Sequence, residues 1–376
     1  MKVVSVKKIL KQSRKIIYIF IMSSGLKSLA LLERDDGGDL MHVWSFPGLD
    51  EKTKNVLLSR SAISDELISK RCQFTFSRSC GIWHYSLAYF SITVPKNNKR
   101  VHAFNFILSS TVFNPEKYYA LLKVMSDVYS EKGNVVEVFG LYLTSYTSGK
   151  CFIPRPPGQP KGEWDAKEYN DKKSLIANCS IREICSMFQA ETIILWQAQV
   201  LKKKVLIYSD SISKLVRFVR TMPHFVFQRG EGVWQTLHPL VIGNENEMNE
   251  LSGSGYFCAG TCTASLKSDY PSSTRMYDLY VDLDDRTLSV SEHAKKDFGM
   301  GKMHKKIASL LAEQAKAASD TAAIKAVTNL NLSLIKKLKT IDGLTTTTLQ
   351  KFSAESKHSK SEARFMMNFA MSEGLL

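Results

Sequence analysis

The sequence has no CxxC pair, few cysteines and no long apolar run. Its seven cysteines among 376 residues are an odd number and far below the density of a disulfide-bonded scaffold, so we expect reduced thiols in a cytosolic protein. Cys258 and Cys262 lack two further ligands at zinc-finger spacing, so they do not indicate a metal site. The dense apolar run near the N-terminus, residues 16–22, is far shorter than the about 20 residues that a membrane-spanning helix needs.

Motifs for nucleotide binding and for covalent catalysis are also missing. Gly149-Lys150 lacks the earlier glycine of a Walker loop, and residues 299–302 are too short to form one. Gly253-Ser254-Gly255 is neither a dinucleotide fingerprint nor a nucleophile elbow. The histidines have no metalloprotease spacing, and we expect His84 and His102, on predicted strands, to be hydrogen-bonded structural residues.

Two short charged segments have a structural and a functional interpretation. Residues 279–285 form an apolar strand that ends in Asp-x-Asp, as in haloacid dehalogenase-type phosphatases, but Arg286 replaces the usual Thr. We therefore interpret Asp282, Asp284 and Asp285 as part of an exposed turn. Residues 202–204 are three consecutive lysines, which we assign to the carbonyl end of a helix rather than to a nucleic-acid site.

Positive charge is concentrated at the two ends of the chain. Lysine and arginine exceed aspartate and glutamate by 51 − 36 = 15. Residues 1–21 contain six basic residues and no acid, and residues 295–376 contain 14 basic and 7 acidic residues. Solvated tails and helix faces are the commonest reason for such charge, so we predict no nucleic-acid partner.

The first residues allow three interpretations. The lysines followed by the run 16–22 and by Ser23-Ser24-Gly25 are compatible with a short signal peptide or with a basic arm that touches a membrane. The third interpretation is an extension ahead of a start at Met22, and this is the one that we favour. Residues 1–21 are then predicted to be dispensable.

The pattern from residue 22 to residue 150 is typical of a compact α/β unit. Asp35-Asp36-Gly37-Gly38 reads as a hairpin turn between two strands. Asn114 and Pro115 are an N-cap and a first helical residue, and Gly133 is a typical helix end. The strands are predicted at 26–34, 40–46, 73–77, 83–94 and 101–109, and the helices at 53–63, 115–132 and 135–146.

A Pro-rich stretch separates this unit from the rest. Residues 151–172 contain four prolines, which predicts an interdomain linker.

In residues 173–292, Ser180 and Glu183 have the spacing of a capping box. Short apolar strands alternate there with helices, which favours a partly parallel, helix-covered sheet. The segments are helices at 191–201 and 215–219, strands at 205–208, 277–282 and 287–290, and a helical part at 293–376 with a loop at 345–348.

The order of motifs in the second unit resembles the central module of DENN domain proteins. An apolar helix leads into the buried strand 205–208, and Trp234-Gln235, His238-Pro239-Leu240 and a glycine-bounded strand at 255–260 follow. Further similarity to the DENN domain-containing protein 10 group lies at 113–118, 191–195, 220–223, 277–278 and 300–305. The resemblance extends from about Leu26 to Leu311, and it does not include residues 1–21 or the prolines at 154–160.

The resemblance implies a fold, an activity and a location. The fold is α/β: a longin-like lobe with an antiparallel sheet, a DENN lobe with a helix-covered mixed sheet, and a helical C-terminal part. DENN proteins bind Rab GTPases between their lobes and promote GDP release, and the members most similar to this chain are associated with late endosomes. A cytoplasmic protein recruited to late endosomes, touching membranes through its partners, is therefore expected.

Two functions are compatible with these motifs. The first is a guanine-nucleotide exchange factor that stabilises the nucleotide-free Rab. The second is a DENN-fold adaptor that binds a Rab or an endosomal sorting assembly without catalysing exchange. Neither requires a catalytic residue, a cofactor or a metal, and the motifs identify no individual residue that contacts the partner.

Overall fold

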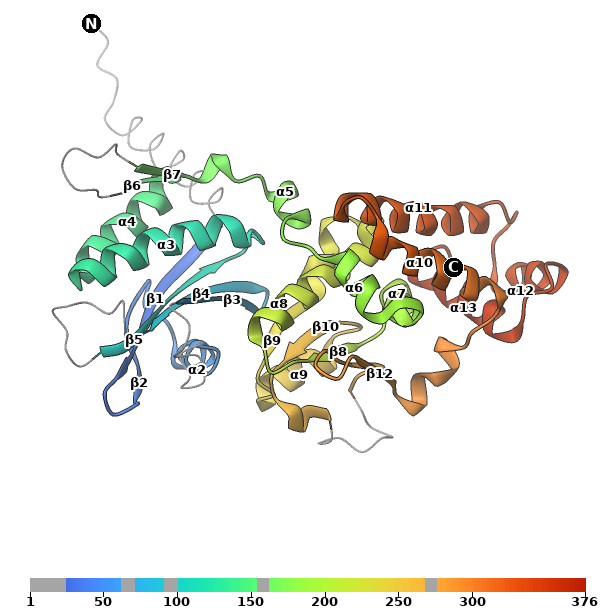
Figure 1. The fold of residues 1–376 in the computed structure, drawn as a ribbon, viewed down its shortest axis with the longest axis horizontal. Helices are drawn as coiled ribbons and strands as arrows, with labels where there is room; N and C mark the ends of the chain where they lie inside the picture. The colour runs from blue at the N-terminus through green and yellow to red at the C-terminus, as the bar shows by residue number, and fades with distance from the viewer. Residues whose placement is uncertain (1–24, 62–71, 91–100, 154–161, 268–275) are drawn as a thin grey trace, which may run out of the picture. The chain divides into compact units, whose positions relative to one another are not determined.

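The fold is described from a computed structural model for residues 25–61, 72–90, 101–153, 162–267 and 276–376. The chain divides into two compact units, Met1–Leu175 and Ile176–Leu376 (Figure 1). The predicted N-terminal extension, residues 1–21, lies outside the described residues, as do parts of the helix predicted at 53–63 and of the strand predicted at 83–94. None of the helices described is long and apolar enough to cross a membrane.

The first unit is built on an antiparallel sheet. Its order in the described residues is β2-β1-β5-β4-β3, and the predicted turn joins β1 to β2 antiparallel. Because side chains alternate along β5, Phe104 and Phe106 lie on one face and Ile107 on the other. The strands are β1 Leu26–Asp35, β2 Leu40–Phe46, β3 Cys72–Ser79, β4 Ile82–Phe90 and β5 Val101–Ser110.

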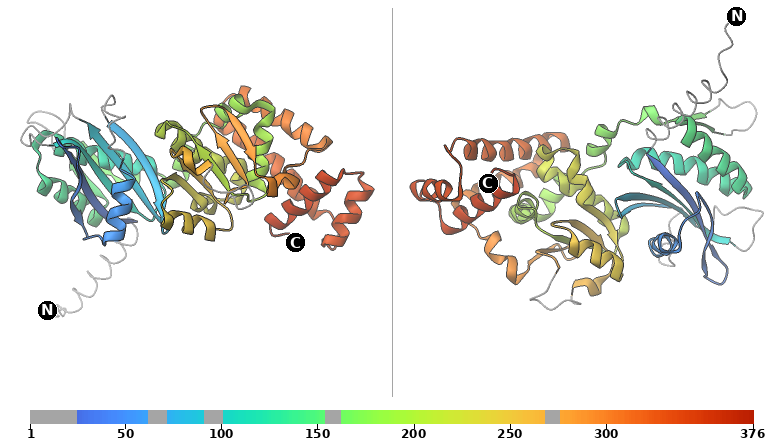
Figure 2. Two further views of the ribbon diagram at one scale, coloured as in Figure 1. Left: turned by 90° about the horizontal axis from the view of Figure 1, so that it is seen from below. Right: turned by 180° about the vertical axis from the view of Figure 1, so that it is seen from behind.

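Helices cover both faces of this sheet. On one face α3 (Pro115–Lys132) and α4 (Val135–Ser148) lie side by side (Figures 1 and 2), and the ring of Tyr129 on α3 contacts Phe104 and Phe106. On the other face Leu57 of α2 (Glu51–Ser59) packs against Ile107 and its neighbours. The predicted cap of α3 is confirmed: Asn114 accepts a hydrogen bond from the Lys117 amide, and Gly133 ends the helix at φ +65°.

The predicted linker at 151–172 is wrong for the residues that the structure describes. Strands β6 (Lys150–Ile153) and β7 (Gly162–Asp165) pair antiparallel, and η3 (Ala166–Glu168) and α5 (Asp171–Ile176) follow. Trp164 is 3 % exposed, and its indole donates to the Lys117 carbonyl oxygen at 3.3 Å. The apolar surface of Trp164 outweighs the proline-rich composition, so this segment belongs to the first unit.

The second unit contains the predicted mixed sheet. Its order in the described residues is β12-β11-β8-β10-β9, where β8, β9, β10 and β11 run parallel and β12 is antiparallel to β11. The strands are β8 Val205–Tyr208, β9 Leu237–Val241, β10 Cys258–Thr261, β11 Leu279–Asp282 and β12 Thr287–Val290. Parallel strands need covering on both faces, which agrees with the burial of nearly every residue of β8, β9, β10 and β11.

Helices α8 (Ile212–Thr221) and α9 (Glu245–Gly253) provide this covering. Met248 and Leu251 of α9 join a cluster with Leu206 of β8. On the α8 side, Gly260 lies so close to the helix that a Cβ atom there would stand 2.9 Å from Val219 and 3.0 Å from Leu215. A residue without a side chain is therefore required where α8 crosses β10.

The helices after residue 293 pack against the rest of the second unit. Helix α10 packs on α6 and α7, and α11 packs on η5 and α6, while α13 contacts η8. The predicted C-terminal part is thus continuous with the unit that begins at Ile176. The remaining helices are α6 Ile181–Phe188, η4 Gln189–Glu191, α7 Thr192–Val200, η5 Met222–Arg229, η6 Glu231–Thr236, η7 Ala264–Lys267, η8 Glu292–Phe298, α10 Lys302–Glu313, η9 Gln314–Lys316, α11 Asp320–Lys339, α12 Thr346–Glu355 and α13 Lys360–Ser372.

Two local predictions for this unit are wrong. The Ser180 side chain makes no capping hydrogen bond. The Ser180 amide donates to the Thr221 hydroxyl at 3.3 Å, and the Glu183 carboxylate pairs with Arg217 of α8. The predicted loop at 345–348 begins helix α12, since Thr345 and Thr348 form a capping box there.

Candidate functional site

The second unit places polar groups at the carboxyl ends of its parallel strands, where ligands bind in sheets of this type. Ser209 and Asp210 follow β8, and Asp284 follows β11. The Asp284 carboxylate accepts hydrogen bonds from the Ser209 hydroxyl at 3.0 Å, the Asp210 amide at 2.8 Å and the Lys214 ammonium at 2.8 Å. The two strand ends and the first turn of α8 are therefore joined by one carboxylate.

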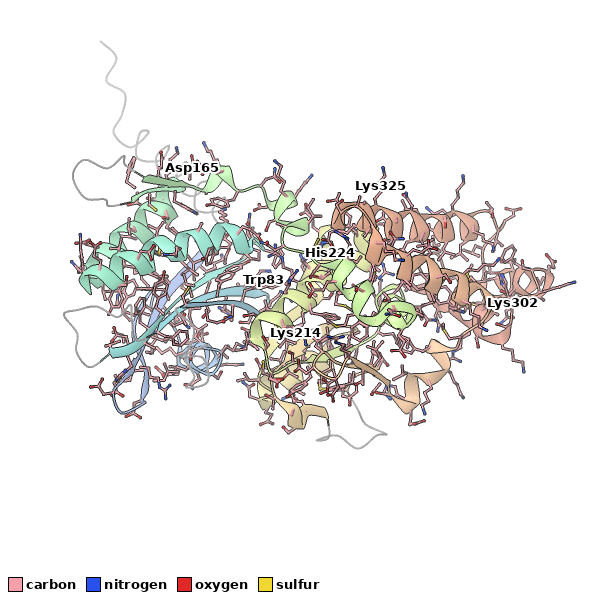
Figure 3. All side chains as sticks on the ribbon, viewed as in Figure 1. Trp83, Asp165, Lys214, His224, Lys302 and Lys325 are labelled. Carbon is pink, nitrogen blue, oxygen red and sulfur yellow. The ribbon has the colours of Figure 1, made fainter. Side chains whose placement is uncertain are left out.

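The surroundings of Asp284 stabilise the ionised form of its carboxylate. Partial burial acts to raise the pKa of Asp284, but the hydrogen bonds from its neighbours outweigh it and hold the pKa well below its usual range. Asp210 shares this site, and its hydrogen bond and repulsion with Asp284 raise the pKa of Asp210. Lys214 also donates to the Leu283 carbonyl oxygen at 2.7 Å, so its ammonium is fixed beside the strand ends (Figure 3).

A cleft of about 290 Å³ lies beside this junction, between α6 and α8. Ile184, Met187 and Phe218 provide an apolar floor, and Glu183, Lys214 and Arg217 provide charge, with serines completing the lining. Ile184 and Phe218 are buried in the core of the unit. We refer to this feature as the α6–α8 cleft.

An ion pair crosses the cleft. Arg217 Nη2 lies 2.9 Å from Glu183 Oε2, and the two side chains are 55 % and 53 % exposed. A pair this exposed contributes little to stability, in the range of about 0–1 kcal/mol. Both groups are thus free to exchange their partner for a charged group of another molecule without unfolding the unit.

The α6–α8 cleft is suited to recognition. An apolar floor with a charged rim holds a side chain of a partner and orients it by charge. No group of three or more His, Cys, Asp or Glu side chains that could hold a metal ion was found among the described residues. The lining combines serine hydroxyls with charged and apolar side chains.

The segments singled out in the sequence have structural roles. Asp282 is buried and accepts hydrogen bonds from the amides of Asp284 and Asp285 at 3.1 Å each. The turn interpretation is confirmed, although Asp282 itself is not exposed. Among the three lysines, Lys203 Nζ lies 2.5 Å from the Asp297 carboxylate, and Lys204 Nζ donates to the Ser252 carbonyl oxygen at 3.3 Å.

The two histidines differ. His84 is 6 % exposed, and its ring nitrogens lie 3.0 Å from the hydroxyls of Ser79 and Ser109. His102 is exposed and lies 3.0 Å from the Asp36 carboxylate. The structural interpretation is confirmed for His84, while His102 belongs to a surface pair.

The cleft residues were not identified from the sequence. Lys214 and Arg217 are three residues apart on an amphipathic helix that directly follows a buried parallel strand, and this combination is the signal that was available. Glu183 gave no such signal, because its position after Ser180 is equally typical of a capping box.

Comparison with known proteins adds three relatives and one family. Residues 178–292 match the family model described as "SPA: Stabilization of polarity axis", and every residue of the α6–α8 cleft lies in this range. The chain is 30% identical over 370 residues to DENN domain-containing protein 10 of Dictyostelium discoideum, covering 93% of this chain and 97% of that protein. It is 30% identical over 317 residues to the Danio rerio protein of the same name, covering 84% and 86%, and 29% identical over 290 residues to that of Homo sapiens, covering 76% of each.

Proposed function

The chain belongs to the DENN domain-containing protein 10 family, and from this membership we propose that it is a guanine-nucleotide exchange factor for a Rab GTPase that acts in late endosome homeostasis and trafficking. The family supports a Rab-related role in general. The step to exchange activity and to late endosomes rests on the resemblance of the chain to DENN proteins. Relatedness over 97% of the Dictyostelium protein is the observation that carries the proposal.

The proposed mechanism uses binding energy alone. An exchange factor binds the nucleotide-free GTPase more tightly than the GDP-loaded form, and by linkage it weakens GDP binding by the same factor. Such a protein needs complementary surface and no nucleophile. The α6–α8 cleft, inside the matched range 178–292, offers apolar area and charge of both signs, and we assign it to the Rab-contacting surface of the second unit.

The test is a GDP-release assay with the full chain. A panel of purified Rabs loaded with fluorescent GDP is mixed with stoichiometric protein, and the rate of fluorescence loss is measured in excess unlabelled nucleotide. We expect faster release from one or a few Rabs, together with tightest binding to their nucleotide-free form.

Two other outcomes are informative. Binding to a GTP-loaded Rab or to an endosomal sorting assembly without faster release would replace exchange by an adaptor role. No interaction with any Rab of a complete panel would overturn the Rab-related proposal as a whole.

A further inference from the structure

A second cavity lies wholly within the first unit and outside the matched range 178–292. It has a volume of about 280 Å³. Residues of α3, α4, β7 and η3 line it, together with Tyr169 and Asp171, which follow η3. Its walls include Lys117, Ser145, Ser148, Trp164, Tyr169 and Asp171. This size is near the lower end of sites for small molecules.

Lys117 is the unusual residue of this cavity. It is 7 % exposed, and its backbone is fully used, since its amide donates to Asn114 Oδ1 at 3.1 Å and its carbonyl oxygen accepts from the Trp164 indole at 3.3 Å. Its ammonium lies 5.5 Å from the centre of the Tyr118 ring. Within the described residues, no oxygen atom forms a hydrogen bond or an ion pair with this ammonium.

The Asp171 carboxylate does not accept a hydrogen bond from the Lys117 ammonium. Asp171 lines the same cavity, but its Oδ1 accepts a hydrogen bond from Asn114 Nδ2 at 2.7 Å, and it attracts Lys117 only through space. Burial lowers the pKa of Lys117, and the Asp171 charge opposes that effect. The Lys117 ammonium is not among the fully buried nitrogen atoms that lack a partner, so it keeps contact with solvent, and an oxyanion that enters the cavity replaces that water as its acceptor.

The other groups in the cavity restrict what would bind there. The hydroxyl hydrogens of Ser145 and Ser148 are already donated to the carbonyl oxygens of Leu141 and Thr144. The Lys117 amine is thus the strongest donor in the cavity for an incoming oxyanion, whereas the amine of Lys167 is exposed and solvated. Asp171 on the same wall repels a second negative charge, so a singly charged group fits better than a dianion.

An aromatic wall completes the cavity. The rings of Trp164 and Tyr169 are stacked, with centroids 6.2 Å apart and planes 29° apart. We propose that this cavity binds a small organic acid with a single carboxylate, which accepts a hydrogen bond from the Lys117 ammonium while its apolar part contacts the Trp164–Tyr169 wall. This site is independent of the proposed exchange activity.

Benzoate and benzamide test the proposal, because they have the same shape and differ in charge. Binding to the full chain is measured by titration calorimetry at constant ionic strength. Benzoate is expected to bind at least tenfold more tightly than benzamide, and the Lys117→Met variant to lose roughly tenfold to a hundredfold in benzoate affinity, as for a hydrogen bond to a charged group. Lys167→Met, which removes an exposed amine from the same rim, is the matched control and should lose less than threefold.

A second measurement uses the unmodified protein. Acetylation of Lys117 by a limiting amine-reactive ester, followed by mass spectrometry, should be slowed by benzoate and not by benzamide or inorganic phosphate. Equal affinity for benzoate and benzamide, unchanged benzoate affinity in Lys117→Met, or unprotected Lys117 would each overturn the proposal.

Discussion

The indole of Trp196 on α7 donates a hydrogen bond of 2.9 Å to Oδ1 of Asn331 on α11, across 135 residues of sequence. The same amide donates from Nδ2 to the Phe225 carbonyl oxygen at 2.8 Å and to Gln228 Oε1 at 2.9 Å. Asn331 is fully buried, so a single side chain joins α7, η5 and α11. In the sequence, Asn331-Leu332-Ser333 matches the glycosylation pattern, but an amide in this position is inaccessible in the folded protein.

Replacing this amide is predicted to destabilise the second unit. Asn331→Ala leaves the Trp196 indole and the Phe225 carbonyl without partners, and each unpaired buried group costs about 1–3 kcal/mol. The free energy of unfolding in urea should fall by about 2–6 kcal/mol. Asn329→Ala, at an exposed position on the same helix, is the control and should stay within about 0.5 kcal/mol. Equal losses in the two variants would contradict the assigned role.

Truncating Trp234 is predicted to unfold its surroundings. The side chain is 2 % exposed, and its ring contacts His224 and Phe227 at centroid distances of 5.7 and 6.0 Å. Trp234→Ala should cost about 3–5 kcal/mol and lower Rab binding with it. Within the described residues its indole nitrogen has no hydrogen-bond partner, so Trp234→Phe should cost less than the alanine variant. An unchanged melting temperature with abolished Rab binding would instead place Trp234 at the interface.

Acid is predicted to destabilise the first unit through His84. Burial, assisted by the nearby Arg60 charge, lowers the pKa of His84 to about 3. As the pH falls, the unfolded chain, with a histidine pKa of about 6.5, binds a proton before the folded protein does. The contribution of neutral His84 to the free energy of unfolding is therefore complete above about pH 6.5 and is lost as the pH falls toward 3. Between pH 7 and pH 5 it amounts to about 2 kcal/mol. The free energy of unfolding in urea is measured at pH 7 and at pH 5 for the parent chain and for His84→Gln. The decrease between the two pH values should be smaller in His84→Gln by about 2 kcal/mol. An equal decrease in both proteins would refute the assignment.

Removing a charge from the α6–α8 cleft is predicted to weaken Rab binding without loss of stability. Arg217 is exposed, and its pair with Glu183 contributes little to folding. The free energy of unfolding of Arg217→Ala should therefore lie within about 0.5 kcal/mol of that of the parent chain. A lost interfacial charge pair should reduce Rab affinity by roughly tenfold or more. Lys325→Ala on α11 (Figure 3) is the distant control. Normal exchange by Arg217→Ala would exclude the cleft from the contact surface.

Elements with local chemical signals were predictable. The β1–β2 hairpin follows from its Asp-Asp-Gly-Gly turn, and α3 begins and ends at the predicted capping residues Asn114 and Gly133. These signals act between residues a few positions apart, so they are readable without knowledge of the fold. The buried strand β8 was similarly evident from its uninterrupted apolar residues.

The candidate site depended on long-range contacts and was therefore missed. Glu183 turns to Arg217 instead of capping α6, and this choice requires α6 and α8 to be packed together. The α6–α8 cleft exists only between two helices whose separation in space the sequence does not state. The available signal, Lys214 and Arg217 on a helix that follows a buried parallel strand, is equally typical of an ordinary polar helix face.

The alternation of strands and helices, the two sheet types and the relationship to DENN proteins follow from the amino-acid sequence, because local periodicity and the order of motifs carry that information. Three features became evident from the packed fold: Trp164 joins the predicted linker to the first unit, Asn331 connects three helices, and Lys117 is buried beside a cavity. Each of these outcomes depends on whether a distant part of the chain covers the residue. Burial removes water from polar groups and makes their few remaining partners decisive, and that environment is created only when the chain has folded.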